Sequence, residues 1–248
     1  MSLKMNDAPY QRSPRTTFRI MMELTAALLI VWLAAVIYNF TLDAEFGVKA
    51  ILLMVVALVA TAAIDAVVAL IKHKKGGDLK KELIDGVVKN YSYVTAIIFT
   101  LCCPVYVSYY VIIIGCLAAT GIKHCFGGFG KNIFNPAIIG RIVVGLAFTD
   151  AFSPTDAFKS AIKTGATLTT QYSGQGVKWL SDVLPGKFNL GNLLIGNYAG
   201  SLGETFTLLI LALGIVLMVR KVINWRSSAF YLGTVAITSL FIGFFIKD

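Results

Sequence analysis

Long apolar runs restrict the fold of this chain more than any other feature. Hydrophobic residues make up 57% of it and charged residues 14%, whereas soluble domains average about 45–50% and about 25%. Such runs indicate helices, because lipid cannot satisfy the hydrogen bonds of exposed backbone. We therefore predict an all-α polytopic membrane protein with about seven transmembrane helices. They fall over residues 20–40, 50–71, 87–103, 105–122, 133–148, 205–219 and 228–246.

The distribution of lysine and arginine predicts the orientation. With the N-terminus inside, 14 basic residues lie in the inner tail and loops and six in the outer ones. This predicts a cytoplasmic tail over 1–19, a first helix set over 20–148, an extracytoplasmic loop over 149–190 and the start of a second helix set over 191–248. The expected location is the cell (inner) membrane. The net charge of +9 is not gathered as a nucleic-acid surface requires, so we expect no nucleic-acid partner.

Two of the predicted segments, 87–103 and 133–148, are short and are interrupted or bounded by proline or glycine. Interrupted hydrophobic segments usually mark backbone that lines a site rather than faces lipid. We therefore expect short broken helices and a re-entrant glycine-rich loop. A proline kink without function remains the alternative.

The motif CFGGFGKNIFNPA, residues 125–137, carries the clearest chemical signal. Its glycines allow close approach of the backbone to another group. Asn132 and Asn135 lie three apart, so both amides can share one face of a helix start and suit a neutral heterocycle with alternating donors and acceptors. The alternative is that the asparagines cap the next helix, with Pro136 in its first turn. The spacing leaves both interpretations open.

Two further motifs are weaker. In the outer loop, Thr164, Gly165 and Ala166 precede Thr167 and leave its hydroxyl accessible, although ordinary loops share this composition. The motif GSLGE, residues 200–204, opens the sixth segment. Its Glu204 suits a helix N-terminus, so a capping role and a functional role are equally compatible with it.

Ionisable residues at membrane depth are costly and usually face a partner or a wet path. Asp65, Arg141 and Glu204 are therefore candidates for ion coupling or ligand contact, and a structural ion pair is an equal alternative for Asp65. Glu23 lies nearer an interface, where its side chain is expected to reach water.

The remaining reactive residues favour ordinary roles. His73 and His124 lie in basic inner loops and are expected on the solvated surface. The cysteines show no CxxC pair, so we expect structural roles for them and no metal site. The cysteines are Cys102, Cys103, Cys116 and Cys125.

Three motifs together carry a resemblance. GGFGKNIFNPAIIGR at 127–141, the GAT tripeptide at 165–167 and GSLGE at 200–204, in this order, resemble the D subunit of the Rnf complex. The homologous B subunit of the sodium-pumping NADH:quinone oxidoreductase shares them. The resemblance runs from about residue 20 to the end, and the short N-terminal tail favours the Rnf protein.

The resemblance implies a membrane flavoprotein that relays electrons within an ion-translocating (Na⁺ or H⁺) ferredoxin:NAD oxidoreductase complex. It implies FMN joined through its phosphate to Thr167 by a flavin transferase, with Thr164, Gly165 and Ala166 around it. It also implies a non-covalent riboflavin near Asn132 and Asn135. Arg141 is a further candidate for flavin contact. The implied partners are the other subunits of the complex, the transferase and the lipid bilayer.

Three alternatives stay open at this point. The chain could serve a sodium-pumping NADH:quinone oxidoreductase, act as a channel or permease with broken helices, or form a scaffold without a cofactor. Members of the family continue beyond the seventh segment, so we expect the sequence to be incomplete at Asp248.

Overall fold

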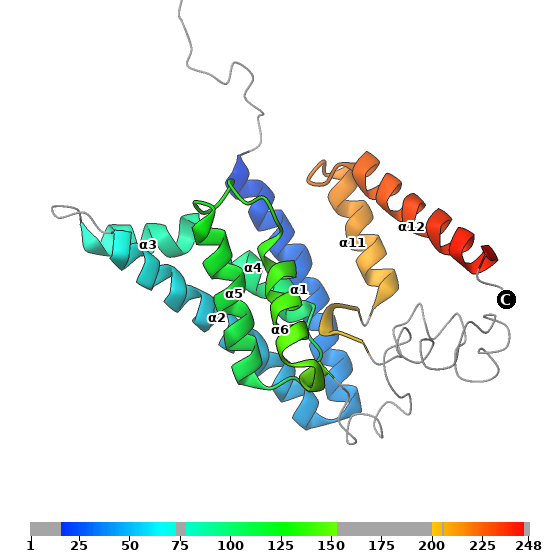
Figure 1. Cartoon of the computed structure of the whole chain (residues 1–248), viewed down its shortest axis with the longest axis horizontal. Coiled ribbons are helices and arrows are strands. Elements are labelled where there is room, and N and C mark those ends of the chain that lie inside the picture. The colour runs from blue at the N-terminus through cyan, green and yellow to red at the C-terminus, as the bar shows by residue number, and fades with distance from the viewer. Residues whose placement is uncertain (1–15, 73–77, 153–199, 205, 246–248) are drawn as a thin grey trace, which may run out of the picture.

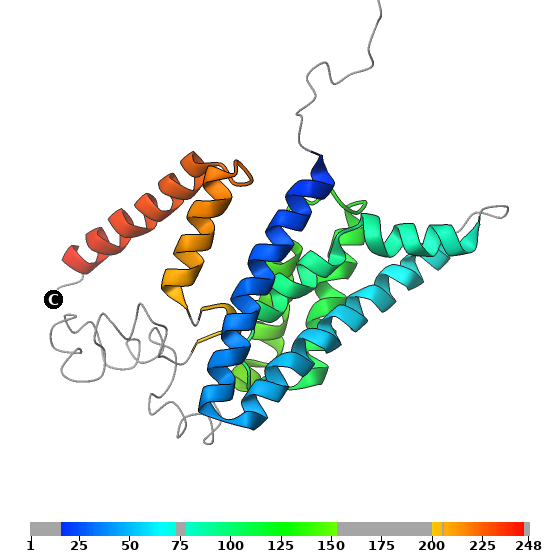
Figure 2. The same ribbon diagram turned by 180° about the vertical axis from the view of Figure 1, so that it is seen from behind.

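The structure is a computed structural model that describes residues 16–72, 78–152, 200–204 and 206–245, and the regular secondary structure in these ranges is helical. Figures 1 and 2 show a bundle formed by the first six helices and a separate pair of later helices beside it. The helices are α1 (Thr17–Leu42), α2 (Ala44–Lys72), α3 (Leu79–Lys89), α4 (Ser92–Leu101), α5 (Tyr109–Cys125), α6 (Pro136–Ala147), α11 (Thr207–Val219) and α12 (Trp225–Phe245), with short 3₁₀ turns η1 (Thr149–Phe152) and η2 (Leu202–Glu204).

Helices α1 and α2 are long and apolar enough to cross a membrane. At 1.5 Å per residue, their 26 and 29 residues extend about 39 Å and about 44 Å, more than the roughly 30 Å of a bilayer core. The Thr16 side chain caps the start of α1 by accepting from the Arg19 N–H. The Asp43 carboxylate accepts from the Glu45 N–H and starts α2, so the two helices join within a single residue.

The third predicted segment is divided in the structure. Helix α3 ends at Lys89 and α4 begins at Ser92, with Tyr91 between them in the left-handed conformation at φ 50°. Helix α3 lies crosswise to α5 and α6, at the end of the bundle where α1 begins (Figures 1 and 2). The two helices differ in composition: LKKELIDGVVK mixes charged with apolar residues, whereas α4 is apolar and mostly buried.

The core lies where α2, α4, α5 and α6 meet. Phe99 of α4 is fully buried, and a Cβ added at Gly115 of α5 would lie 2.1 Å from its ring. A Cβ added at Gly140 of α6 would lie 2.7 Å from the Gly115 carbonyl oxygen. Glycine therefore lets these helices approach at backbone distance, as is usual where lipid supplies no hydrophobic drive for helix association.

Helices α11 and α12 form a hairpin that packs lightly on the bundle. Helix α11 contacts α1, and its one buried residue is Leu217. The α12 side chains that the structure describes are exposed or half-buried, including Phe230, Tyr231 and Leu240. The fold is thus all-helical, with two membrane-span candidates and several shorter apolar helices.

Candidate functional site

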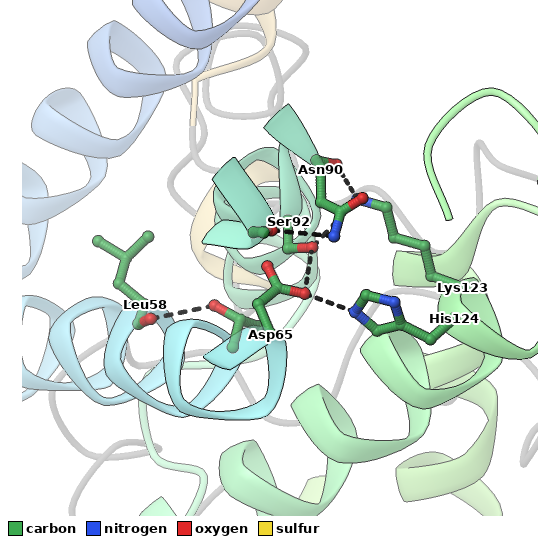
Figure 3. Close-up of polar contacts among 8 residues, drawn as sticks. Leu58, Asp65, Asn90, Ser92, Lys123 and His124 are labelled. Atoms are coloured by element: carbon green, nitrogen blue, oxygen red, sulfur yellow. Dashed lines mark hydrogen bonds and ion pairs between the residues drawn. The ribbon is translucent and has the colours of Figure 1, made fainter. Parts of the chain in front are cut away.

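A buried carboxylate lies where α2, α4 and α5 meet. Asp65 of α2 is 1% exposed, and its Oδ1 atom accepts from the Ser92 hydroxyl at 3.1 Å. The same oxygen lies 2.6 Å from Nε2 of His124. Figure 3 shows both side chains turned toward Asp65 from α4 and α5. A carboxylate removed from water needs such partners, because its burial is otherwise costly.

Lys123 extends this cluster to the junction between α3 and α4. Its side chain is buried, and its ammonium donates to the Asn90 carbonyl and, at 3.2 Å, to the Ser92 hydroxyl (Figure 3). The Asn90 side chain in turn donates to the Gly86 carbonyl at 2.9 Å. Lys123 therefore connects α5 to the junction between α3 and α4.

The sequence prediction for His124 was wrong. Its side chain is 8% exposed and paired with Asp65, not solvated on a surface loop. Lys123 was counted only as an inner-loop charge, and the structure buries it. Asp65 could have indicated these partners, because a carboxylate inside an apolar helix requires one. Lys123 and His124 directly follow the fourth apolar segment and were therefore candidates. His73 lies outside the described residues.

A pocket lies beside the Asp65–His124 pair. The second carboxylate oxygen of Asp65, Oδ2, is buried and has no hydrogen-bond partner among the residues that the structure describes. Asp65 and His124 both line the pocket, whose volume is about 280 Å³. The other lining residues are Val68, Ala69, Lys72, Asp85, Gly86, Asn90, Gly127 and Gly128. The α3–α4 junction and the end of α5, which contribute lining residues, lie at the end of the bundle where α1 begins (Figures 1 and 2).

The glycine-rich loop forms one wall of this pocket. Gly127, Gly128 and Gly130 have positive φ angles of 101°, 91° and 85°. The Gly128 N–H donates to the Lys123 carbonyl at 2.9 Å and so closes the end of α5. A Cβ at Gly128 would lie 3.3 Å from the Asn90 side-chain oxygen. Here the glycines are needed both for the backbone conformation and for the close approach of the loop to the α3–α4 junction.

The two asparagines of the loop occupy different environments. Asn135 is the N-cap of α6, accepting from the Ala137 N–H at 3.1 Å, with Pro136 in the first turn. Asn132 precedes the helix, so the pair does not share one face of a helix start. Its amide oxygen is buried and has no partner within the described part of the chain.

Aromatic side chains surround this loop. The rings of Tyr91 and Phe129 lie 4.8 Å apart and those of Phe126 and Phe134 lie 6.3 Å apart. The three phenylalanines are exposed. The loop thus carries both exposed flat apolar surfaces and an amide oxygen without a partner among the described residues, the kinds of group that contact a planar polar heterocycle.

Arg141 organises a second interruption, after α4. Its Nε donates to the Cys102 carbonyl at 3.0 Å, and its guanidinium lies 3.8 Å from the centre of the Phe152 ring. A Cβ at Gly145 would lie 2.8 Å from Nη1, so glycine leaves room for the guanidinium. The arginine therefore satisfies a carbonyl that is freed where α4 ends, within an otherwise apolar core.

The GSLGE motif packs against the same interruption. The Leu202 N–H donates to the Cys103 carbonyl at 3.0 Å, and a Cβ at Gly203 would lie 2.9 Å from the Leu101 Cβ. Glu204 accepts from the Ser201 N–H at 3.2 Å within the 3₁₀ turn η2. It therefore caps its own turn, three residues before α11 begins. Asp65 and Glu204 belong to separate interruptions and do not form one site.

The predicted flavin-bearing residues Thr164, Gly165, Ala166 and Thr167 lie outside the described residues. The cysteines are free thiols, with Cys103 and Cys116 buried, Cys102 half-buried and Cys125 exposed. Within the described ranges, no group of three or more His, Cys, Asp or Glu side chains could hold a metal ion.

Glu23 forms an ion pair instead of extending alone into water. Its carboxylate lies 3.0 Å from the Arg220 guanidinium, which follows α11, and 3.3 Å from Arg19 of its own helix. The hydrogen bond from Arg220 to this carboxylate, together with its negative charge, raises the pKa of the Arg220 guanidinium. This pair connects the later hairpin to α1.

Comparison with known proteins assigns the chain to a family. The model of the NQR2, RnfD, RnfE family matches residues 4–248. The chain belongs to this family. Its motifs and apolar helices are thus those of a family of membrane proteins, and a membrane location follows.

Two relatives match nearly the whole chain. The D subunit of the proton-translocating ferredoxin:NAD(+) oxidoreductase complex of Clostridium ljungdahlii is 29% identical over 94% of this chain and 67% of its own length. The D subunit of the Na(+)-translocating ferredoxin:NAD(+) oxidoreductase complex of Acetobacterium woodii is 28% identical over 98% and 70%. The chain therefore spans about two thirds of the length of these relatives.

A third relative matches a shorter part. The B subunit of the Na(+)-translocating NADH-quinone reductase of Neisseria meningitidis is 32% identical over 60% of this chain and 37% of its own length. Its similarity therefore leaves more of this chain unmatched than that of the two proteins above.

Proposed function

We propose that this chain is a membrane component of an ion-translocating ferredoxin:NAD oxidoreductase complex and relays electrons within it. The observation that carries the proposal is the similarity to the D subunits of two such complexes over 94% and 98% of the chain. A role in a sodium-pumping NADH:quinone oxidoreductase is the alternative, favoured by a match of higher identity over only 60%. The other subunits of the complex are the partners that the relatives' names imply.

The proposed membrane arrangement has seven crossings, with the N-terminus in the cytoplasm of a cell whose inner membrane holds the chain. The excess of basic residues in one set of loops supports this orientation. In it, the pocket beside Asp65 faces the cytoplasm, and the loop over 126–135 re-enters the bundle from that side. The stretch over 149–190 is extracytoplasmic.

The proposed covalent cofactor is FMN, attached through its phosphate to Thr167 by a flavin transferase. The GAT tripeptide, placed between the other two family motifs, supports this assignment, and Thr164, Gly165 and Ala166 leave the hydroxyl accessible to the transferase. Bound FMN would supply one- and two-electron redox chemistry; the protein would hold and orient it.

The proposed second cofactor is a non-covalent riboflavin at the glycine-rich loop. The buried amide oxygen of Asn132, which lacks a partner among the described residues, and the exposed rings of Phe126 and Phe129 fit a planar heterocycle. Asn135 contributes by fixing the start of α6. Arg141 holds the end of α4, and Asp65 and Glu204 are the proposed ion-coupling residues of the two interruptions.

In-gel flavin fluorescence tests the covalent assignment. The complex that contains this chain is produced together with a flavin transferase, denatured and separated on a gel. A fluorescent band is expected at the mass of this chain and should disappear in Thr167→Val. The control, Thr169→Val, should retain it. Fluorescence that persists in Thr167→Val would place the flavin elsewhere, and absence of fluorescence in the wild type would favour a channel or a scaffold.

Extractable riboflavin tests the second assignment. Asn132→Leu removes the amide oxygen without removing the cap of α6, whereas Asn135→Asp preserves the cap. The expected result is loss of extractable riboflavin in Asn132→Leu and retention in Asn135→Asp. Equal riboflavin content in Asn132→Leu and the wild type would refute this site.

A further inference from the structure

We infer that Asp65 and His124 form a proton-exchange site that opens only to the pocket beside the glycine-rich loop. The inference rests on the proposed function for what the proton does, namely loading an ion-coupling step from the cytoplasmic side. The contacts of the two side chains, the charged groups near them and the apolar core beside them support the site itself.

The geometry of the pair suits proton exchange. One carboxylate oxygen lies 2.6 Å from the imidazole and accepts from Ser92, while the other is buried without a partner in the described ranges. Both residues line the pocket. The pair thus contains a group that changes its charge readily, an anion that stabilises the charged form, and a neighbouring pocket that both residues line.

The charges around the pair favour a proton over a metal cation. The Lys123 ammonium is linked to the carboxylate by two hydrogen bonds through the Ser92 hydroxyl, and Lys72 lines the same pocket. The Lys131 side chain lies against Gly127, one of the residues that line the pocket. Asp85 also faces the pocket, but its carboxylate is 2.6 Å from the Lys89 ammonium. This excess of basic groups disfavours a metal cation, whereas a proton adds to the imidazole itself.

The proton-exchange step conserves atoms and charge. A hydronium ion in the pocket gives its proton to the neutral imidazole and becomes water, so the Asp65–His124 pair changes from a net charge of −1 to zero. Release to a water molecule reverses the step. Ser92 and Lys123 hold the carboxylate in place and need not gain or lose a proton.

Apolar side chains pack on the side of the Asp65–His124 pair that faces away from the pocket. Fully buried apolar side chains occupy the core below it, among them Leu53, Phe99 and Ile112. The nearest polar side chain along α2, Thr61, donates to the carbonyls of its own helix, at Ala57 and Leu58. Among the described residues, Thr61 therefore does not extend the hydrogen bonds of Asp65 along α2, and we expect exchange to run through the pocket.

Nitrogen-15 NMR of histidine in the full chain in lipid nanodiscs tests the site. The chain has two histidines, so His73→Gln leaves the signal of His124 alone. Its signal should move from the neutral to the imidazolium position as the pH is lowered from about 8.5 to about 5.5. At the wild-type midpoint, Asp65→Asn should reduce the protonated-to-neutral ratio about tenfold. Asp85→Asn, the matched control at the same pocket, should change it less than about threefold.

Three results would overturn the inference: a His124 signal constant across this range, an unaltered ratio in Asp65→Asn, or a response to sodium in place of choline that requires Asp65. The last result would make this a metal-cation site. The titration of His124 in the wild type tests the inference even if Asp65→Asn does not fold. Because the measurement needs neither flavin nor partner subunits, Thr167→Val should titrate like the wild type, and the two proposals can fail independently.

Discussion

The six-helix bundle and the α11–α12 hairpin are both rich in apolar residues, yet they are held in different ways. In the bundle, α4 buries eight of its 10 residues and α5 buries seven of 17, and polar side chains such as Asp65 and Lys123 join one helix to another. In the described part of the hairpin, Leu217 is the buried residue, and the contacts with the bundle include the α1–α11 packing, η2 and the Glu23–Arg220 pair.

The difference shows that apolar sequence alone does not determine how a membrane helix packs. Close approach in the bundle depends on glycines opposite large side chains, as at Gly115 and Phe99, and on buried polar contacts. The hairpin contacts the bundle mainly along α1 and at η2 and exposes most of its apolar surface to its surroundings. Changes in the bundle should therefore be more damaging than matched changes in the hairpin.

The largest effect is expected from Gly115→Ala. Its added Cβ would lie 2.1 Å from the fully buried Phe99 ring, so the α4–α5 interface must open. We expect the midpoint of thermal unfolding, measured by fluorescence-detected size exclusion, to fall by about 5–10 °C. Gly121→Ala, in the same helix with no atom within 4 Å of the new Cβ, should not lower it. Equal losses in both variants would contradict this packing.

Lys123→Met should have the next largest effect. It leaves the Asn90 carbonyl and the Asp65 carboxylate without their buried cation, which we expect to cost about 2–3 kcal/mol. Lys89→Met removes an ammonium that is 72% exposed and should change stability by less than about 0.5 kcal/mol. Chemical denaturation of both variants measures the contrast. A Lys123 variant as stable as the wild type would show that the cluster does not hold the α3–α4 junction.

Gly203→Ala tests the contact between hairpin and bundle. The new Cβ would meet the Leu101 Cβ at 2.9 Å and the Leu101 carbonyl at 3.0 Å, which displaces η2 from the end of α4. Amide hydrogen exchange of α11 should rise several-fold, while that of α5 remains unchanged. The control is Gly214→Ala, within α11 and without close neighbours. Faster exchange in both helices would mean that hairpin and bundle unfold as one unit.

Glu23→Gln should have the smallest effect. The Arg220 partner is half exposed, so the pair is screened by water and salt. We expect the unfolding midpoint to fall by less than about 2 °C at low salt and not at all at about 1 M salt. A large, salt-independent loss would show that the ion pair, and not η2, fixes the hairpin.

Much of the fold follows from the sequence, because long apolar helices are determined locally. Helix α1 lies close to its predicted bounds, since the lack of water in the bilayer core leaves its backbone few alternatives, and α2 ends close to its predicted end but begins six residues earlier, at Ala44. The division near Asn90 was not predicted, because the left-handed conformation of Tyr91 depends on contacts that Lys123 makes from a distant part of the chain.

Only part of the site could be predicted from the sequence. Asp65 could be selected because a carboxylate in an apolar run is costly wherever it lies. His124 could not, since its proximity to Asp65 arises only when α2 and α5 pack together. The assignment of Thr167 depends on the family motif, and that residue lies outside the described part of the chain.

Mass spectrometry of the peptide around Thr167 tests the central claim most directly, namely that this protein carries electrons on a flavin. The peptide is taken from active complex isolated from its native membrane. We predict that it carries the mass of FMN less one water, localised by fragmentation to the Thr167 hydroxyl. An unmodified peptide in fully active complex would contradict the claim.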